Sequence, residues 1–195
     1  MRVSVKGETT ADRVLDLAES LAQTRGFHGF SYGDVATELG ITRAALHYYF
    51  PSKAELGVAR IHRYHQRFRA RLDEMTASSS SPAQCVEQYA EIYRALFANG
   101  RMCLCGMLAA EFETLGEPLR PALVAFFDTS YDWLAATLTA GRDSGTIRFA
   151  GEARETAELV VSTLEGAMLV NRPVGNAVRF DDVVRRLLAQ LLVSR

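Results

Sequence analysis

The stretch from Tyr32 to Leu56, YGDVATELGITRAALHYYFPSKAEL, decides the fold. Two short helices that cross at a steep angle need a small residue at their contact, and Ala36 is suitable. The turn between them needs a residue that tolerates a left-handed backbone, and Gly40 follows four positions later. Ile41 and Leu46 then return apolar side chains to the core. This spacing predicts a helix-turn-helix.

The outer face of the second helix carries side chains suited to duplex DNA. Arg43 can donate to guanine edges in the major groove. The neighbouring hydroxyl and imidazole groups can bind phosphates, and an aromatic ring can pack on a thymine methyl. Lys53 follows at the start of the next helix, where exposed amides and the helix dipole favour a phosphate. The predicted DNA-binding residues are Thr42, Arg43, Ala45, His47, Tyr48, Tyr49 and Lys53.

Helical periodicity extends over almost the whole chain. Apolar residues recur three and four positions apart, and Gly, Pro and one serine-rich stretch at 78–82 separate the periodic segments. We predict an all-α fold of about nine helices. They are expected at about 10–25, 32–39, 42–49, 52–74, 83–98, 102–115, 121–143, 152–171 and 179–193.

Composition and charge favour a globular protein with a basic front end. The chain has 195 residues, and 48% of them are hydrophobic, which excludes a disordered chain. Residues 1–72 contain 11 Lys and Arg against 7 Asp and Glu, whereas residues 73–195 contain 11 against 16. This asymmetry indicates that the front end meets an anionic polymer.

The sequence also bears on the compartment. The amino terminus has no apolar stretch, and no run approaches the roughly 18–20 apolar residues of a membrane helix. The three cysteines, Cys85, Cys103 and Cys105, are too few and odd in number for a disulfide framework. We therefore expect a cytoplasmic protein with no membrane partner.

The run ITRAALHYYFPSKAEL at residues 41–56 closely resembles the signature of TetR-family repressors. In that signature a short recognition helix ends in an aromatic cluster, followed by Phe, a short link, Ser-Lys and an acidic-leucine pair. The preceding GFHGFSYGDVATELG at 26–40 resembles the family's entry into its second helix, and the match covers roughly Thr10 to Leu56. His47 and Tyr49 exchange the family's more usual Tyr and His.

The resemblance implies a DNA-binding transcriptional regulator, a repressor released from a near-palindromic operator by a small-molecule effector. It also implies a homodimer in which the effector changes the separation of the two recognition helices. We place the helix-turn-helix domain at residues 1–56 and the ligand-binding and dimerisation domain at 57–195.

The last two predicted helices give independent support for a homodimer. Their apolar surfaces, over about 152–171 and 179–193, are wider than one core stripe needs. They can cover their own core and still pair with a copy of themselves as a four-helix interface. The alternative is that both helices are buried within one chain.

The effector site is less well defined by the sequence. Residues 89–133 are rich in large side chains, which line an apolar pocket or fill an ordinary core. Glu111 lies one helical turn after Met107 and can hold a cationic or hydrogen-bonding ligand, or form a surface salt bridge. The predicted effector-binding residues are Tyr93, Phe97, Cys103, Met107, Glu111, Phe126, Trp133 and Met168.

The cysteines raise an alternative function. The segment MCLCGMLAAE at 102–111 resembles a Cys-x-x-Gly-x-Leu-Ala-x-Glu segment of some family members, including electrophile-sensing repressors, and aligns Cys103 with the reactive position. A cysteine near a helix start can have a lowered pKa and react as thiolate, whereas a buried cysteine is a small apolar residue. A cysteine-based redox or electrophile-sensing regulator, or less favourably an all-α redox enzyme, is therefore the competing hypothesis.

The sequence contains no nucleotide-binding glycine loop, metal-ligand cluster or nucleophile elbow. We therefore predict that the chain is not an enzyme and that it has no cofactor and no metal site.

Overall fold

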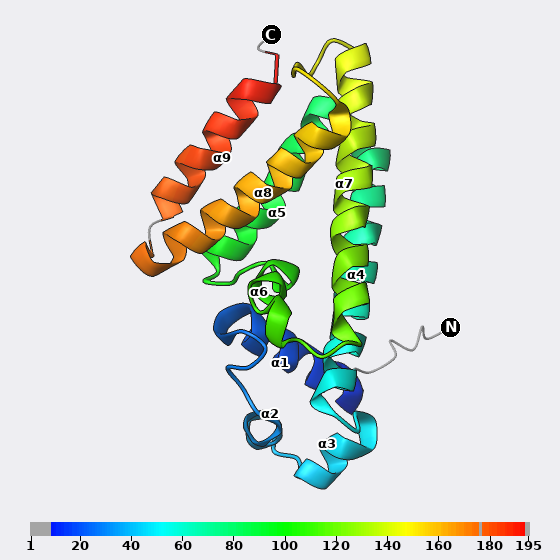
Figure 1. Ribbon diagram of the computed structural model, residues 1–195, viewed down its shortest axis with the longest axis vertical. Coiled ribbons are helices and arrows are strands. Elements are labelled where there is room, and N and C mark those ends of the chain that lie inside the picture. The colour runs from blue at the N-terminus through cyan, green and yellow to red at the C-terminus, as the bar shows by residue number, and fades with distance from the viewer. Residues whose placement is uncertain (1–8, 176, 194–195) are drawn as a thin grey trace, which may run out of the picture.

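The computed structural model describes residues 9–175 and 177–193. Within them the chain forms nine α-helices and two short 3₁₀ turns but no β-strand, so the predicted all-α fold is confirmed (Figure 1). The α-helices are α1 (Thr10–Arg25), α2 (Tyr32–Leu39), α3 (Arg43–Tyr49), α4 (Lys53–Ser78), α5 (Pro82–Ala98), α6 (Leu104–Ala110), α7 (Leu119–Asp143), α8 (Ala153–Asn171) and α9 (Ala177–Leu191). The 3₁₀ turns are η1 (Phe112–Thr114) and η2 (Arg172–Val174). No helix in this part of the chain is long and apolar enough to cross a membrane.

Polar caps start the first three helices. Thr9 and Ser31 each form a capping box, in which the hydroxyl and the acidic residue three positions later exchange hydrogen bonds with each other's backbone amides. Thr42 Oγ1 accepts from the Ala45 amide at 3.0 Å. These bonds give partners to amides that a helix start leaves unpaired, and so they fix where α1, α2 and α3 begin.

Two helices differ most from their predicted bounds. The helix expected over 102–115 is shorter, because Cys103 has extended backbone angles and α6 ends at Ala110, before the 3₁₀ turn η1. Helix α4 continues to Ser78, whereas the sequence predicted its end at about 74. Leu72 and Met75 are buried, so α4 stays packed against the domain to its carboxyl end.

Helix α4 joins two bundles. The small bundle of α1, α2 and α3 lies at one end of the molecule, and α5, α7, α8 and α9 form the larger one (Figure 1). The first part of α4 packs on α1, and its later turns run beside α7. At the centre of the larger core, the ring of Phe126 lies 4.8 Å from that of Phe68. Helix α6 lies between α1 and the larger bundle (Figure 1).

Candidate DNA interface and effector region

The turn between α2 and α3 has the geometry that the sequence predicts. Gly40 adopts a left-handed conformation with φ of 66° and ψ of 32°. The Ile41 amide then donates to the Ala36 carbonyl at 3.0 Å, and Leu46 is completely buried. The Tyr32 hydroxyl donates to the Phe50 carbonyl at 2.8 Å, across the two ends of the unit. Helix α3 is thus held by α2 and by the core along one side only.

The other side of α3 is exposed. Thr42, Arg43, Tyr48 and Tyr49 all lie on the surface, and Tyr48 has 83% of its surface accessible. A tyrosine this exposed does not contribute to the core of its own chain, so it is available to a partner. Ala45 is half-buried, which limits it to a backbone or methyl contact at the edge of this face.

His47 is exposed but already has an intramolecular contact. Its Nδ1 lies 3.0 Å from the Pro51 carbonyl oxygen, and its ring lies 4.8 Å from that of Tyr32. Because a carbonyl oxygen only accepts, Nδ1 carries the proton and Nε2 of the neutral ring is an acceptor. In this tautomer Nε2 does not donate to a phosphate, and the phosphate contact of His47 stays a prediction. Nε2 can accept from the exocyclic amine of adenine or cytosine.

Lys53 is not presented as the sequence suggests. Its Nζ donates to the Phe30 carbonyl and lies 4.7 Å and 4.5 Å from the ring centres of Phe27 and Phe30. Partial burial lowers the pKa of this ammonium. The side chain joins α4 to the segment between α1 and α2, because its stem and ammonium pack on those two rings. In this structure the Lys53 side chain thus makes internal contacts, and its phosphate contact stays a prediction.

Several positive charges of the front end are also engaged inside the chain. Arg63 pairs with Asp16, and Arg67 pairs with Glu19, so α4 is held to α1 by ion pairs. Arg60 is completely buried, and its Nη1 donates to the Ala18 carbonyl at 2.9 Å. The net positive charge of residues 1–72 thus overstates the charge available to DNA, and Arg43 is the cation placed on α3 itself.

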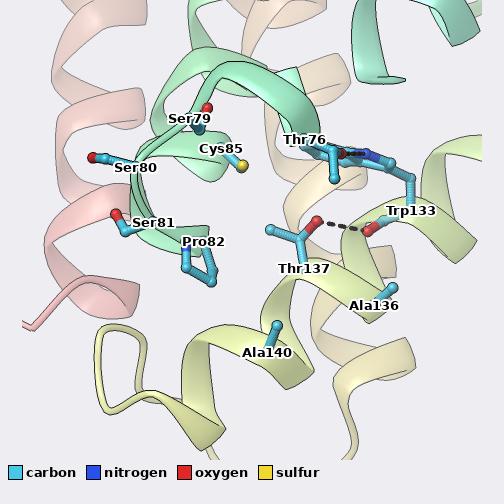
Figure 2. Close-up of a pocket in the computed structure, with 10 residues that line it drawn as sticks. All are labelled: Thr76, Ser79, Ser80, Ser81, Pro82, Cys85, Trp133, Ala136, Thr137 and Ala140. Atoms are coloured by element: carbon cyan, nitrogen blue, oxygen red, sulfur yellow. Dashed lines mark hydrogen bonds between the residues drawn. The ribbon is translucent and has the colours of Figure 1, made fainter. Parts of the chain in front are cut away.

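The predicted effector-binding residues do not form one site. Phe126 and Met168 are buried in the core, and Phe97 stacks on Phe180 with 4.7 Å between ring centres. Trp133 lines a separate cavity of about 370 Å³ beside the serine-rich loop and Cys85 (Figure 2). There its Nε1 donates to Thr76 Oγ1 at 2.9 Å (Figure 2).

Glu111 contacts the DNA-binding bundle. Its Oε2 accepts from the Phe27 amide at 2.6 Å, directly after α1 ends. This contact is neither of the two roles expected for Glu111, ligand binding or a surface salt bridge. Two further bonds join the same regions, because Met102 donates its amide to the Gln23 carbonyl and Arg172 donates to the Thr24 carbonyl. The segments on both sides of α6 and the end of α8 are therefore tied to the last turn of α1.

Tyr93, Cys103 and Met107 do lie in one region, around a residue that sequence analysis missed. Glu165 projects from α8 and accepts a hydrogen bond from the Tyr93 hydroxyl at 3.3 Å. Burial raises the pKa of its carboxyl to about 7. The sequence does carry a signal for it, since Glu165 is the lone charge in the otherwise apolar and small-residue run from Leu159 to Val170.

Cys103 does not have the properties expected of a reactive thiol. It is 2% exposed, and burial, followed by the nearby Glu165 carboxylate, raises its pKa well above the usual range. The expected lowering at a helix start does not occur, because the apolar surroundings and the acidic neighbour both disfavour thiolate. Cys85, Cys103 and Cys105 are all buried free thiols.

Helices α8 and α9 carry exposed apolar side chains besides their buried ones. Leu159, Leu169 and Val170 on α8 are each more than half exposed, as is Val178 near the start of α9. A groove between the two helices, with a volume of about 390 Å³, is lined by Leu159 and Val183. Large exposed apolar side chains on two neighbouring helices favour an interaction site on this side of the domain.

Known proteins match the chain along most of its length. Residues 14–59 match the model of bacterial regulatory proteins of the tetR family, and residues 83–187 match the tetracyclin repressor-like C-terminal domain. No curated protein matches the chain. A TetR-family transcriptional regulator from Agrobacterium tumefaciens is 32% identical, with a TM-score of 0.90, over 94% of this chain and 97% of that one. A TetR transcriptional regulator from Legionella pneumophila is 29% identical, with a TM-score of 0.84, over 98% and 100%.

A third structure, the reduced form of Escherichia coli NemR, shares the fold at 23% identity, with a TM-score of 0.83, over 95% of this chain and 98% of that one. TetR-family regulators bind DNA operators and small-molecule ligands, act as dimers and are not enzymes, so the redox-enzyme hypothesis is set aside. By these matches, the chain belongs to the TetR family of DNA-binding transcriptional regulators.

Proposed function

We propose that the chain is a homodimeric repressor whose two α3 helices enter major grooves of a near-palindromic operator. The exposed face of α3 carries this proposal. It combines a cation, Arg43, with two exposed tyrosines on a helix whose opposite side is buried. Arg43 is assigned to a base edge, and Thr42, Tyr48 and Tyr49 to phosphates or a thymine methyl.

His47 and Lys53 take modified roles in this proposal. His47 Nε2 accepts from a base amine, because Nδ1 is occupied by the Pro51 carbonyl. Lys53 orients the start of α4, and the first amides of that helix, ahead of the Glu55 amide that Ser52 caps, are assigned to a phosphate. Ala45 contributes a close methyl contact at the edge of the groove.

The dimer is assigned to α8 and α9, whose exposed apolar side chains support a four-helix interface. Two-fold symmetry would then place the recognition helices on half-sites about 34–36 Å apart, or a multiple of that spacing. Within each protomer, residues 1–56 bind DNA and residues 57–195 bind the effector and the partner, with α4 belonging to both bundles.

The junction between α1 and α6 supports a route from effector to operator. Glu111 follows α6 directly and holds the Phe27 amide, and Arg172 follows α8 and holds the Thr24 carbonyl. A ligand that separates α6 from α8 would move these two anchors relative to each other. The orientation of α1, and with it α3, would change, and the two α3 helices would no longer match the groove spacing.

Selection from a pool of random duplexes tests this proposal. The purified protein is incubated with the pool at low and moderate salt, and retained duplexes are sequenced. Enrichment of a near-palindrome by the wild type, and a changed or weakened consensus with Arg43→Ala, is the expected result. Retention without any enrichment would mean that α3 does not recognise sequence.

A further inference from the structure

The cavity beside Glu165 has the chemistry of a cation site. It lies between α6, α7 and α8, and has a volume of about 240 Å³. Its lining includes Met102, Met107, Phe127, Tyr131 and Glu165. No arginine, lysine or histidine contributes to this lining. The volume lies below the roughly 300–1,000 Å³ of sites for drug-sized molecules, so the cavity suits a small ligand.

The Glu165 carboxyl has no counter-ion among the residues that the structure describes. Its ionisable neighbours are tyrosines and thiols from every helix packed around it: Tyr64 on α4, Tyr89 and Tyr93 on α5, Cys103 and Cys105 at α6, and Tyr131 on α7. All of these groups are neutral near pH 7, since burial raises the pKa of each. Arg172 lies at the outer side of one wall, where its Nη1 is 3.2 Å from Met107 Sδ, but it forms no ion pair with Glu165. The neighbours of Glu165 therefore leave a negative charge on it unpaired.

The absence of a side chain at Gly106 leaves room for the Glu165 carboxyl. A Cβ built at Gly106 would lie 2.1 Å from Glu165 Oε2, so the carboxyl occupies the space that a side chain on α6 would fill. Phe127 and Tyr131 stack nearby, with 6.3 Å between ring centres, and both line the same cavity. An anionic group beside two aromatic rings and methionine side chains is the combination that stabilises an organic cation.

We propose that this cavity binds a small organic cation, with its ammonium group paired to Glu165 and its apolar part against Phe127 and Tyr131. We assign this cation as the effector of the repressor, an assignment that rests on the proposed function. Because Gly106 and Met107 of α6 form one wall and Glu165 of α8 another, the occupant contacts both helices that anchor α1.

Calorimetric titration of the full-length protein at pH 8 tests the site. The probes are benzylammonium and tetramethylammonium, with benzyl alcohol as the uncharged match for the first. Benzylammonium is expected to bind at least about tenfold more tightly than benzyl alcohol, which corresponds to about 1.4 kcal/mol. Glu165→Gln keeps the side-chain shape and should abolish this preference, whereas Glu155→Gln, an exposed position on the same helix, should preserve it.

Proton release gives a second readout. At pH 7 part of the Glu165 population is protonated, so binding of a permanently charged cation such as tetramethylammonium should release protons. Titrations in two buffers with different heats of ionisation measure this release, and Glu165→Gln should eliminate it. Thermal unfolding of each variant shows whether it is folded.

Three results would overturn the proposal: no measurable binding of either cation, equal binding of benzyl alcohol, or undiminished binding to folded Glu165→Gln. Operator affinity is measured separately, with and without the cation. Cation binding that depends on Glu165 but leaves operator affinity unchanged would keep the site and remove its effector role. Failure of the wild type to bind any operator would contradict the proposed function without affecting the titration.

Discussion

The α3 face and the Glu165 cavity are built in opposite ways. The α3 face comes from eight consecutive residues, 42–49, held by a turn and caps within the same short stretch. The Glu165 cavity gathers residues from α6, α7 and α8, far apart in the chain. The first site is a protruding surface, and the second is a cavity that holds a partly buried acid with no ion-pair partner. This difference explains why the first is readily predicted from sequence and the second is not.

The largest expected effect on operator affinity comes from breaking the proposed dimer interface on α8 and α9, which brings two copies of α3 to one operator. Leu159→Glu places a charge on an exposed apolar position of α8 and should leave the protomer folded, because Leu159 is 63% exposed. Loss of the dimer should lower operator affinity by about 100-fold or more, since both half-sites no longer bind together. Light scattering and anisotropy titration measure the two effects. Val124→Glu, at an exposed position on α7, is the matched control, and equal loss in both variants would contradict the assignment.

Next in size is the removal of the cation from the α3 face. Arg43→Ala should cost about 1–3 kcal/mol of operator binding and relax the preference at one base position of each half-site. Competition between the operator and single-base variants measures this effect. A uniform loss over all base variants would show that Arg43 binds phosphate only.

Glu165 should affect the stability of the fold in a pH-dependent way. The folded state raises the pKa of Glu165 to about 7 from an ordinary value of 4.5, so it retains a proton that the unfolded chain loses in this window. Wild-type stability attributable to this group is full below about pH 4.5 and falls as pH rises to about 7. Because glutamine does not titrate, the free energy of unfolding of Glu165→Gln should rise relative to that of the wild type by about 1–3 kcal/mol as pH increases across that window.

Denaturant unfolding at a fixed protomer concentration, at several pH values from 4.5 to 8, gives the difference between the two proteins. A difference that does not change with pH would show that Glu165 ionises as freely in the folded chain as in the unfolded one.

A smaller effect is expected where the two regions meet. Glu111→Ala removes the hydrogen bond to the Phe27 amide. The effector should then change operator affinity less than in the wild type, which means that the coupling free energy between the two sites falls by about 1 kcal/mol or more. Effector affinity measured without DNA should change little, because Glu111 does not line the Glu165 cavity. Unchanged coupling in a folded Glu111→Ala protein would exclude this junction as the route.

The smallest expected change is at His47. His47→Ala removes the ring that contacts Pro51 and Tyr32, and should weaken operator binding about tenfold or less. If Nε2 accepts from a base amine, the loss should fall mainly on one base position. An even loss over all sequences would instead support a phosphate contact by the protonated ring.

These two regions show how far the sequence predicts this protein. Gly40, Ala36 and the caps at Ser31 and Thr42 act over a few residues, so the spacing of residue types was enough to predict the helix-turn-helix. Lys53 shows the limit, because its inward turn depends on the rings of Phe27 and Phe30, which lie more than 20 positions earlier.

The effector region depends on packing between distant helices. The bond between Glu111 and Phe27 spans 84 positions, and that between Glu165 and Tyr93 spans 72. Helical periodicity shows that such residues lie on a helix but not which neighbour they meet. Two local features of the sequence coincide with the cavity, although neither predicts it. Glu165 is a lone charge in an apolar run, and Gly106 lies within an otherwise good helix segment.

Hydroxyl-radical footprinting on the selected operator shows whether two α3 helices bind together. We expect two protected patches, each centred on a half-site and separated by about 34–36 Å or a multiple of it, that disappear together when Leu159→Glu breaks the dimer. A single protected patch, or two patches that persist with a monomeric protein, would contradict a dimer that places two α3 helices in major grooves.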